Sequence, residues 1–348
     1  FILNNTFWLI ENSEQLTNLD KMGYKEAFIE PVGMDSNKHP VENPISFIYF
    51  HPKLSQKGYI ISINHNEAFS LKLEKVIEVL KKYDVLYTTD KKTSIQYLKL
   101  NNLWDIIIPP LHYPNINNTK SYDNFLRTNT NQSNLNYIYP LSKQYEYFDL
   151  LYNEVKDKCF ISNTKYAKFY NNKVSLIFAY IESSGIKVNK EIFEDFFHKI
   201  DRDVVFTKYN IKTTTTRPSN SFNGVNYAAL NKKNGCRKAF IPTEGNKLVE
   251  FDFTAYHPSL IAKLIDYDFK GENIHTYFSN LYNVDYNKAK ELTFKQIYGN
   301  VFPQYSHLEF FQKLKNLIKN IWDDFDEKGY YECPISNYVF VKDLLENM

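Results

Sequence analysis

The stretch LVEFDFTAYHPSLIAKL, residues 248–264, places a carboxylate, Asp252, between two phenylalanines inside an apolar run. The alternation that opens the stretch predicts a strand with Glu250 and Asp252 on one face. Pro258 stands where a helix can begin, and SLIAKL continues as an apolar helical stripe. A strand that ends in an acid and turns into a helix can hold a metal-binding carboxylate at a sheet edge. For this stretch alone, an Asp that caps the helix or pairs with a lysine is the simpler interpretation.

Composition limits the classes of protein to which the chain can belong. With 348 residues, 43% hydrophobic and 17% aromatic, it is long and apolar enough for two or three folded domains. Its net charge of +2 means that any nucleic-acid surface is local. The cysteines form no CxxC pair, which argues against zinc and a disulfide framework and favours a reducing compartment. No run is long and apolar enough for a membrane span or signal core, so we expect a cytoplasmic protein without membrane contact.

The first third of the chain alternates strand-like and helix-like segments. AFIEPV, ISFIYF, KGYIISI and DVLYTT predict strands, and SLKLEKVIEVLKKY and TSIQYLKL predict amphipathic helices, which together indicate an α/β layer structure. From about Lys143 to Phe197 the pattern is helical, with Gly185 ending one helix and Asn189 capping the next. DYNKAKELTFKQIYGNVF and HLEFFQKLKNLIKNIWDDF predict two further helices, and GYYECPISNYVFV predicts a hairpin.

Two of the four arginines lie close before Asp252 in the sequence. Arg217 follows a run of threonines in KTTTTRPSN, and Arg237 lies in GCRKAF. The planar guanidinium fits phosphate or carboxylate better than a lysine ammonium does. Both arginines are therefore candidate phosphate ligands, and an ion pair of Arg237 with Glu244 or Glu250 is the alternative.

The predicted helix AKELTFKQIYGN carries a third candidate group. Lys290, Phe294, Ile297 and Tyr298 recur at helical spacing on one face, and Gly299 ends the helix. A lysine can bind the phosphates of a nucleotide while an aromatic ring stacks on its sugar or base. The alternative is an ordinary amphipathic helix whose lysine extends its stem along the apolar surface.

In order and spacing, these segments together resemble the polymerase module of family A DNA polymerases, the DNA polymerase I-like group, and a phage-type member in particular. The resemblance covers about residues 213–300. It is carried by Thr216-Arg217, Arg237 to Phe240, Asp252-Phe253-Thr254, Asn273-Ile274-His275, and Lys290, Phe294, Tyr298 and Gly299.

The resemblance implies a role for each of these positions. Asp252 and Lys290 are the implied catalytic residues, with Asp252 binding magnesium in a two-metal site and Lys290 contacting the incoming phosphates. The other implied nucleotide-binding residues are Phe253, Thr254, His257, Phe294 and Tyr298. The resemblance implies that Thr216, Arg217, Arg237 and Gly299 contact primer–template DNA. The implied partners are DNA, dNTPs and a processivity factor or other replisome proteins.

Several positions depart from the family pattern. His257 stands where the family has a glutamate that excludes ribonucleotides, and Tyr286 replaces an expected arginine, so sugar selectivity and triphosphate affinity stay open. The region between Lys190 and Thr213 is too short for the long helical thumb that grips the duplex. The thumb is therefore vestigial or replaced by another protein, and we expect weak processivity from the isolated chain.

The N-terminal part resembles the 3′–5′ exonuclease domain of the same family with its acidic residues largely lost. Glu30 stands alone in AFIEPV, Asp90 alone in YTTDKKTS, and the third acidic place reads Tyr166 to Tyr170. Since two-metal hydrolysis needs those carboxylates, the resemblance implies an inactive, structural domain.

The second catalytic aspartate of the family has no counterpart before Met348. The acids of WDDFDEKG lie at a predicted helix C-terminus and are expected to be solvated surface. The sequence is therefore interpreted as an incomplete polymerase, truncated or one part of a split enzyme.

The resulting prediction is a multidomain α/β and α+β protein. It comprises an RNase H-like exonuclease-type domain (1–160), a helical connector or vestigial thumb (161–212), and the N-terminal part of a palm with helical fingers (213–348). The predicted function is template-dependent DNA synthesis. The alternatives are a non-catalytic DNA-binding or replisome-scaffold subunit and a single-subunit RNA polymerase, with Phe294 favouring the DNA enzyme.

Overall fold

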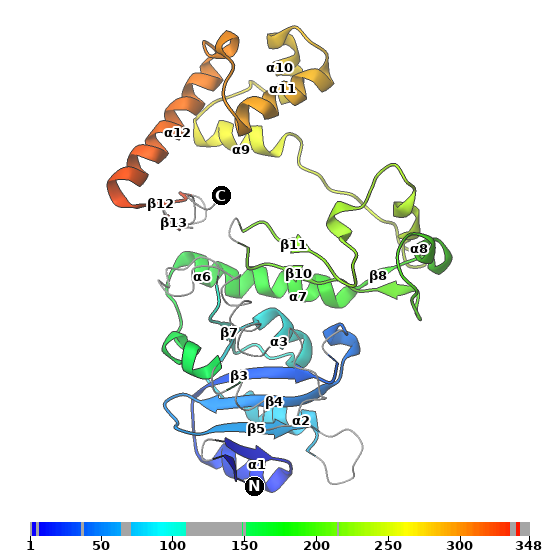
Figure 1. Ribbon diagram of the computed structural model, residues 1–348, viewed down its shortest axis with the longest axis vertical. Coiled ribbons are helices and arrows are strands. Elements are labelled where there is room, and N and C mark those ends of the chain that lie inside the picture. The colour runs from blue at the N-terminus through cyan, green and yellow to red at the C-terminus, as the bar shows by residue number, and fades with distance from the viewer. Residues whose placement is uncertain are drawn as a thin grey trace. The chain divides into compact units, whose positions relative to one another are not determined.

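The computed structural model describes residues 2–4, 7–35, 38–63, 71–108, 148, 151–213, 216–334 and 339–341 (Figure 1). Its contacts divide the chain into two compact units, whose main parts are Phe1–Lys247 and Leu248–Cys333. The domain boundaries predicted at residues 160 and 212 are finer divisions and stay predictions.

A seven-stranded mixed sheet forms the base of the first unit, in the order β1-β2-β5-β4-β3-β6-β7. β3 pairs in parallel with β6, and β6 in parallel with β7, while β4 runs antiparallel to both β3 and β5. The four predicted strands are confirmed as β3 to β6. The strand bounds are Ile2–Asn4, Phe7–Ile10, Glu26–Gly33, Ile45–Pro52, Gly58–Ser62, Val85–Thr88 and Leu103–Asp105 for β1 to β7.

Three helices pack with this sheet: α1 (Ser13–Lys21), α2 (Leu73–Leu80) and α3 (Lys91–Leu98). Ile48 and Phe50 of β4 and Leu86 of β6 are fully buried and pack in one core with Val76 of α2. Every residue of β4 is buried, because the strand lies inside the sheet and both of its faces are covered. The predicted α/β layer structure is therefore confirmed.

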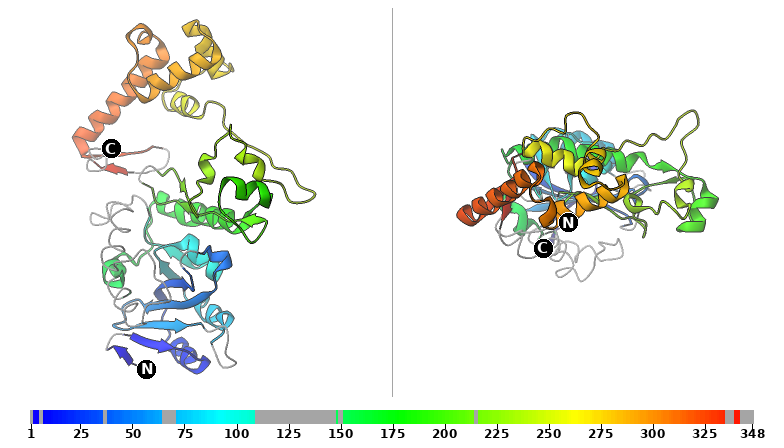
Figure 2. Two further views of the ribbon diagram at one scale, coloured as in Figure 1. Left: turned by 45° about the vertical axis from the view of Figure 1, so that its right-hand side comes forward. Right: turned by 90° about the horizontal axis from the view of Figure 1, so that it is seen from above.

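The second half of the first unit is helical and then irregular (Figure 2). α6 (Lys165–Phe169) runs through a π-helical turn, η3 (Tyr170–Val174), into α7 (Ser175–Ser184). Gly185, with a φ of 65°, ends α7, and the Asn189 side chain caps α8 (Lys190–Phe196), both as predicted. The remaining short elements are η1 (Pro40–Glu42), η2 (Lys156–Lys158), β8 (Ile186–Lys187) with β9 (Val204–Val205), β10 (Tyr209–Asn210) with β11 (Ser219–Asn220), η4 (Tyr227–Ala229) and η5 (Cys236–Ala239).

The second unit is a helical cluster around an aromatic core. It contains α9 (Tyr256–Leu264), α10 (Ile274–Tyr282), α11 (Tyr286–Tyr298), η6 (Pro303–Tyr305) and α12 (Glu309–Lys328). Phe278, Phe310 and Phe311 are its most deeply buried rings. The predicted hairpin is confirmed as β12 (Tyr330–Glu332) paired antiparallel with β13 (Val339–Val341). Within the described ranges, no helix combines the length and apolar character needed to cross a membrane.

The strand predicted at the start of LVEFDFTAYHPSLIAKL is wrong. Residues 248–253 have no regular secondary structure, and the side chains of Phe251 and Phe253 are 93% and 78% exposed. A strand needs a neighbour to satisfy its backbone groups, and no described strand pairs with this segment. The helix predicted to follow it is confirmed as α9.

Candidate nucleotide-binding site

The rotational position of α11 decides which of its side chains are available to a ligand. Ala289, Thr293 and Gln296 are buried against the unit's core, and Ile297 packs partly against it. Lys290 and Tyr298 are exposed and Phe294 is half-buried. The lysine and the two rings therefore do not form the core-facing stripe of an ordinary amphipathic helix.

A buried polar network fixes this rotation. The Thr293 hydroxyl and the Gln296 amide both donate to the Tyr282 hydroxyl of α10, at 3.3 and 3.1 Å. The Gln296 side-chain oxygen accepts the backbone N–H of Phe302 at 3.2 Å. Burial raises the pKa of Tyr282 to about 12, so the phenol stays protonated at neutral pH. Turning α11 would leave these buried groups without partners.

A ladder of rings follows the outer side of α11. Phe294 and Tyr298 stack with centroids 5.9 Å apart and an interplanar angle of 9°. His275, near the start of α10, lies 6.1 Å from Phe294 and 5.4 Å from Tyr286. Flat aromatic surfaces at such spacing can stack on bases and sugars.

The start of α9 joins the same ladder. The Tyr298 hydroxyl and Nδ1 of His257 share a hydrogen bond of 2.5 Å, and the two rings meet edge to face at 5.6 Å. Tyr256 lies 5.2 Å from His257 and 5.5 Å from Phe253. Tyr298 is 66% exposed, so these contacts leave much of its ring open to solvent.

Lys290 is the lysine of α11 whose charge is available. Lys288 and Lys295 of the same helix both pair with Glu291, at 3.0 and 2.6 Å. Lys290 pairs with no carboxylate of the described residues. Burial, and next the charge of Lys290, lower the pKa of His275, so this imidazole is neutral at neutral pH. The Asn273 side chain, which caps α10, accepts the backbone N–H of His275 at 3.0 Å.

Asp252 lies in the exposed segment that precedes α9, and Thr254 beside it is also exposed. In the described ranges, no three or more acidic, histidine or cysteine side chains are grouped to hold a metal ion. Magnesium is often held by one or two protein carboxylates, with phosphate and water completing its shell. Asp252 can therefore serve as one protein ligand of an ion that shares its other ligands with a nucleotide and water.

The acidic cluster at the end of α12 is surface, as predicted. Asp323 pairs with Lys319 at 2.6 Å, and Asp324 pairs with Lys328 at 2.9 Å. Each pair links side chains one helical turn apart in solvent.

The predicted DNA-contacting residues fall in both units. Thr216, Arg217 and Arg237 belong to the first unit and are exposed, and Gly299, also exposed, ends α11 in the second. The Thr213 hydroxyl donates to the carbonyl of Arg217 at 2.8 Å. Arg237 donates to the carbonyl of Leu230 at 3.3 Å and pairs with no carboxylate in the described ranges.

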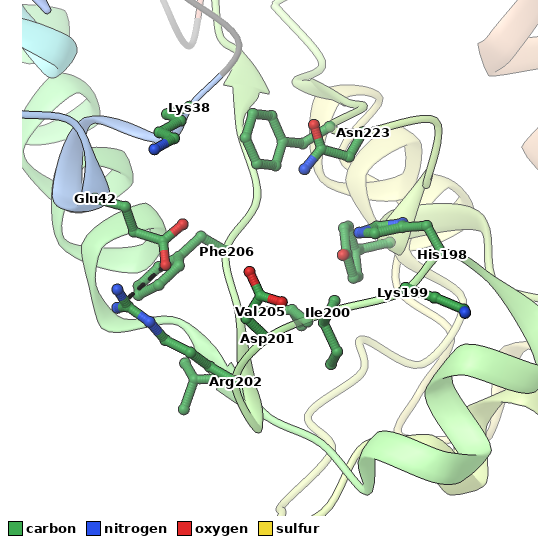
Figure 3. Close-up of a pocket in the computed structure, with 13 residues that line it drawn as sticks. Lys38, Glu42, His198, Lys199, Ile200, Asp201, Arg202, Val205, Phe206 and Asn223 are labelled. Carbon is green, nitrogen blue, oxygen red and sulfur yellow. Dashed lines mark ion pairs between the residues drawn. The ribbon is translucent and has the colours of Figure 1, made fainter. Parts of the chain in front are cut away.

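A cavity of about 270 Å³ lies elsewhere in the first unit, around β9. Figure 3 shows the ion pair between Arg202 and Glu42 at its side, with an N–O distance of 3.2 Å. His198, Phe206 and Tyr227 also line it. None of its lining residues was predicted from the sequence to act in the site.

Sequence reasoning missed two parts of the ladder. The sequence indicated His275 only as part of the segment Asn273-Ile274-His275, and it did not indicate Tyr256 as a site residue. The signal was present as aromatic residues near the starts of α9 and α10, but only the packing of three helices brings them beside Phe294 and Tyr298.

Comparison with solved structures places this arrangement in a known fold. The polymerase (POL) domain of Pol1 from M. smegmatis, solved in complex with a DNA primer-template and dNTP, is similar with a TM-score of 0.63 and 11% sequence identity. The similarity covers 95% of this chain and 81% of that chain. At this identity it shows the fold alone. No protein-family model matches the chain, and no curated protein matches it.

Proposed function

We propose that this chain binds primer–template DNA and a dNTP and carries the nucleotide-binding part of a template-dependent DNA polymerase. The observation that carries the proposal is the outer face of α11, where Lys290, Phe294 and Tyr298 point away from the core in one row. The polymerase-domain fold supports it, because the similar domain was solved with DNA and dNTP.

Each side chain of the row has a distinct part in the proposal. The unpaired ammonium of Lys290 binds the negatively charged phosphates of the incoming nucleotide. The ring of Phe294 stacks near the sugar, and the exposed ring of Tyr298 lies against the template base. His257 shares a hydrogen bond with the Tyr298 hydroxyl, and this contact fixes the orientation of the Tyr298 ring beside the nucleotide.

Asp252 is the proposed magnesium ligand. A bound magnesium ion neutralises the charge that develops on transferring phosphates. Asp252 would hold it as the single protein carboxylate, beside the backbone of Phe253 and Thr254. Because the described residues supply one such carboxylate, the chemistry of this proposal needs a second one from outside them.

Thr216, Arg217, Arg237 and Gly299 are the residues that contact the DNA backbone in this proposal. Contacts of this kind weaken as salt rises, because binding releases counterions from the phosphates. Between Lys190 and Thr213 the described chain forms one helix of seven residues, α8, followed by strands of two residues. We therefore expect few nucleotides to be added per binding event unless a processivity factor is present.

A non-catalytic DNA-binding subunit is the second candidate. The observation that favours it is that, among the described residues, no group of three or more acidic, histidine or cysteine side chains could hold a metal ion. It requires the same DNA contacts and the same ring ladder, so binding alone does not separate the two candidates.

Primer extension with magnesium and all four dNTPs is the deciding experiment. We would compare the chain with Asp252→Asn and with Asp268→Asn, a matched exposed acid of the same unit. Extension that is lost only in Asp252→Asn supports a polymerase, and a parallel reaction with rNTPs tests the RNA polymerase alternative. DNA binding without extension identifies the non-catalytic subunit. Neither binding nor extension contradicts both candidates.

A further inference from the structure

We propose that the ammonium group of Lys212 is the resident cation of a carboxylate cluster in the first unit. It neutralises the cluster in the way a metal ion would, and it anchors the chain around Lys212 to the sheet. The proposal rests on contacts within the first unit and is independent of the proposed polymerase function.

Three acids lie at neighbouring strands of the sheet, where the charge of Asp90 acts on both Glu30 and Asp105. Glu30 lies on β3, Asp90 follows β6, and Asp105 ends β7. β3, β6 and β7 are adjacent and parallel, so their corresponding ends lie along one edge. The backbone N–H of Thr89 donates to Glu30 at 2.6 Å, which ties the first acid to the loop that carries the second.

Lys212 reaches this group from the segment after β10. Its Nζ lies 3.0 Å from Oδ1 of Asp105 and also donates to the carbonyl of Thr89. The two side chains are 14% and 1% exposed, so the pair is largely withdrawn from water. At Glu30, burial raises the pKa and the charge of Lys212 opposes part of that rise. At Asp90, the charges of Lys92 and then Lys212 outweigh burial and lower the pKa.

Hydrogen bonds occupy the oxygens that a metal ion would need. Oδ1 of Asp105 accepts the N–H of Ile107 at 2.9 Å, and Oδ2 accepts that of Lys91 at 3.0 Å. Asp90 accepts both the N–H and the hydroxyl of Thr93, at 3.1 and 2.7 Å, as the cap of α3. A divalent ion would have to displace these donors as well as Lys212.

Burial reduces the negative charge that the cluster carries. Burial raises the pKa of Glu30 to about 7 and that of Asp105 to about 6, so near neutral pH the cluster carries less than its full negative charge. The neighbouring Lys92 is paired at 2.6 Å with Glu182 of α7. Burial lowers the pKa of Lys91 to about 8.

The π-helical turn η3 also contacts the cluster, through Asp105. Asn171, in the π-helical turn η3, accepts the N–H of Asp105 at 2.7 Å and donates to its carbonyl at 3.3 Å. Tyr170, beside it, is fully buried. Sheet, helix and the Lys212 segment therefore all meet at Asp105, which the sequence analysis did not single out.

The test compares the full chain with Lys212→Met, which removes the charge and keeps most of the stem. Lys187→Met is the matched control, since Lys187 lies 3.7 Å from an exposed partner, Asp203. Native-state amide exchange of β6, β7 and α3 reports the stability of the first unit. We expect faster exchange in Lys212→Met, most of all in residues 209–213, and little change in the control.

The pH dependence of the stability loss in Lys212→Met shows whether the loss comes from the missing charge or from altered packing. Without Lys212 the pKa values of Glu30 and Asp105 rise further, so the loss of stability should grow as pH rises from about 5.5 to about 7.5. The double variant Lys212→Met/Asp105→Asn should recover part of the loss at the higher pH. A loss that does not change with pH and is not recovered would overturn the proposal.

A metal titration tests the resident cation directly. Millimolar Mn²⁺ should leave amide exchange of β6 and β7 unchanged in the unmodified chain. Slower exchange with Mn²⁺ in that chain, abolished by Asp105→Asn, would show that a metal ion and not Lys212 is the cation of the site, and would overturn the proposal.

Discussion

Two pairs of charged groups, one in each unit, lie in contrasting surroundings. In the first, Lys92 and Glu182 are 7% and 1% exposed and fully engaged with one another, and Lys212 is held against Asp105. In the second, Lys290 and Asp252 are exposed and pair with no described residue. A buried charge is tolerated only with a partner, so the first arrangement fixes one fold. An exposed, unpaired charge is free to bind a ligand, which is why we assign nucleotide binding to the second unit.

The largest effect that tests this comparison is expected at Glu182. Its carboxylate accepts Lys92 at 2.6 and 2.8 Å, Gln96 at 2.7 Å and the N–H of Tyr209 at 2.5 Å. Glu182→Ala leaves a buried lysine without a partner and should lower the free energy of unfolding of the first unit by about 3–5 kcal/mol.

Denaturant unfolding of the full chain measures this loss. The control Asp203→Ala removes a carboxylate that is 61% exposed, and should cost less than about 1 kcal/mol. Equal losses in the two variants would show that burial does not distinguish the ion pairs of the first unit.

The next largest effect is expected at Lys290. It should appear in the affinity for dNTP and not in the free energy of unfolding. Lys290→Ala removes an exposed, unpaired charge and should leave unfolding within about 0.5 kcal/mol of the unmodified chain. Loss of a charged contact with phosphate should weaken dNTP binding by about 10- to 100-fold, measured by fluorescence titration.

Lys295→Ala is the matched control on the same helix. Lys295 is also exposed but pairs with Glu291, and it lies outside the Lys290–Tyr298 row. A loss of nucleotide affinity as large as that of Lys290→Ala would show that general positive charge, and not the row, binds the phosphates.

The two units also differ in how much of them could be predicted from sequence. Periodicity and caps predicted β3 to β6, α2, α7 with its end at Gly185, and α8 with its cap at Asn189. These features depend on neighbouring residues along the chain. The order of segments from about residue 213 to residue 300, which belong to both units, predicted a polymerase-type fold, and the structural similarity supports it at the level of the fold.

One strand prediction failed, and contacts between residues far apart in the sequence were not predicted. The alternation of residues 248–253 is strand-like, yet no described strand is there to pair with it. The Lys212–Asp105 pair joins residues 107 positions apart, and the contact of His257 with Tyr298 joins residues 41 apart. No local pattern encodes such pairs, so the structure was needed to find them.

The pH dependence of Glu30 gives a smaller effect, in the first unit. Burial, opposed by its hydrogen bond from Thr89 and by Lys212, raises the pKa of Glu30 from 4.5 to about 7. The folded state therefore binds more protons than the unfolded state between these values, and stability falls as pH rises through them. Glu30→Gln should gain stability relative to the unmodified chain by about 1–2 kcal/mol between about pH 5.5 and 7.5.

Comparing the stability of Glu30→Gln with that of the unmodified chain at each pH cancels the contributions of the other titrating groups. Burial lowers the pKa of His39 and His51 to about 4, so their contribution is lost as pH falls below about 6.5, opposite to that of Glu30. These histidines are present in both chains and cancel in the difference. A difference that stays constant with pH would mean that Glu30 titrates normally.

The smallest effect is expected at Tyr298, where the second unit makes one polar contact in its ring ladder. Tyr298→Phe removes the hydrogen bond to His257 and keeps the ring stacked on Phe294, so it should weaken dNTP binding by about 1 kcal/mol or less. Tyr298→Ala also removes the stacking surface and should cost about 1–3 kcal/mol more. In a cycle with His257→Ala, the Tyr298→Phe effect should vanish, because the hydrogen bond is already absent. If Tyr298→Phe instead weakened binding as much as Lys290→Ala, the hydroxyl itself would contact the nucleotide, and the ladder would act through polar recognition as well as stacking.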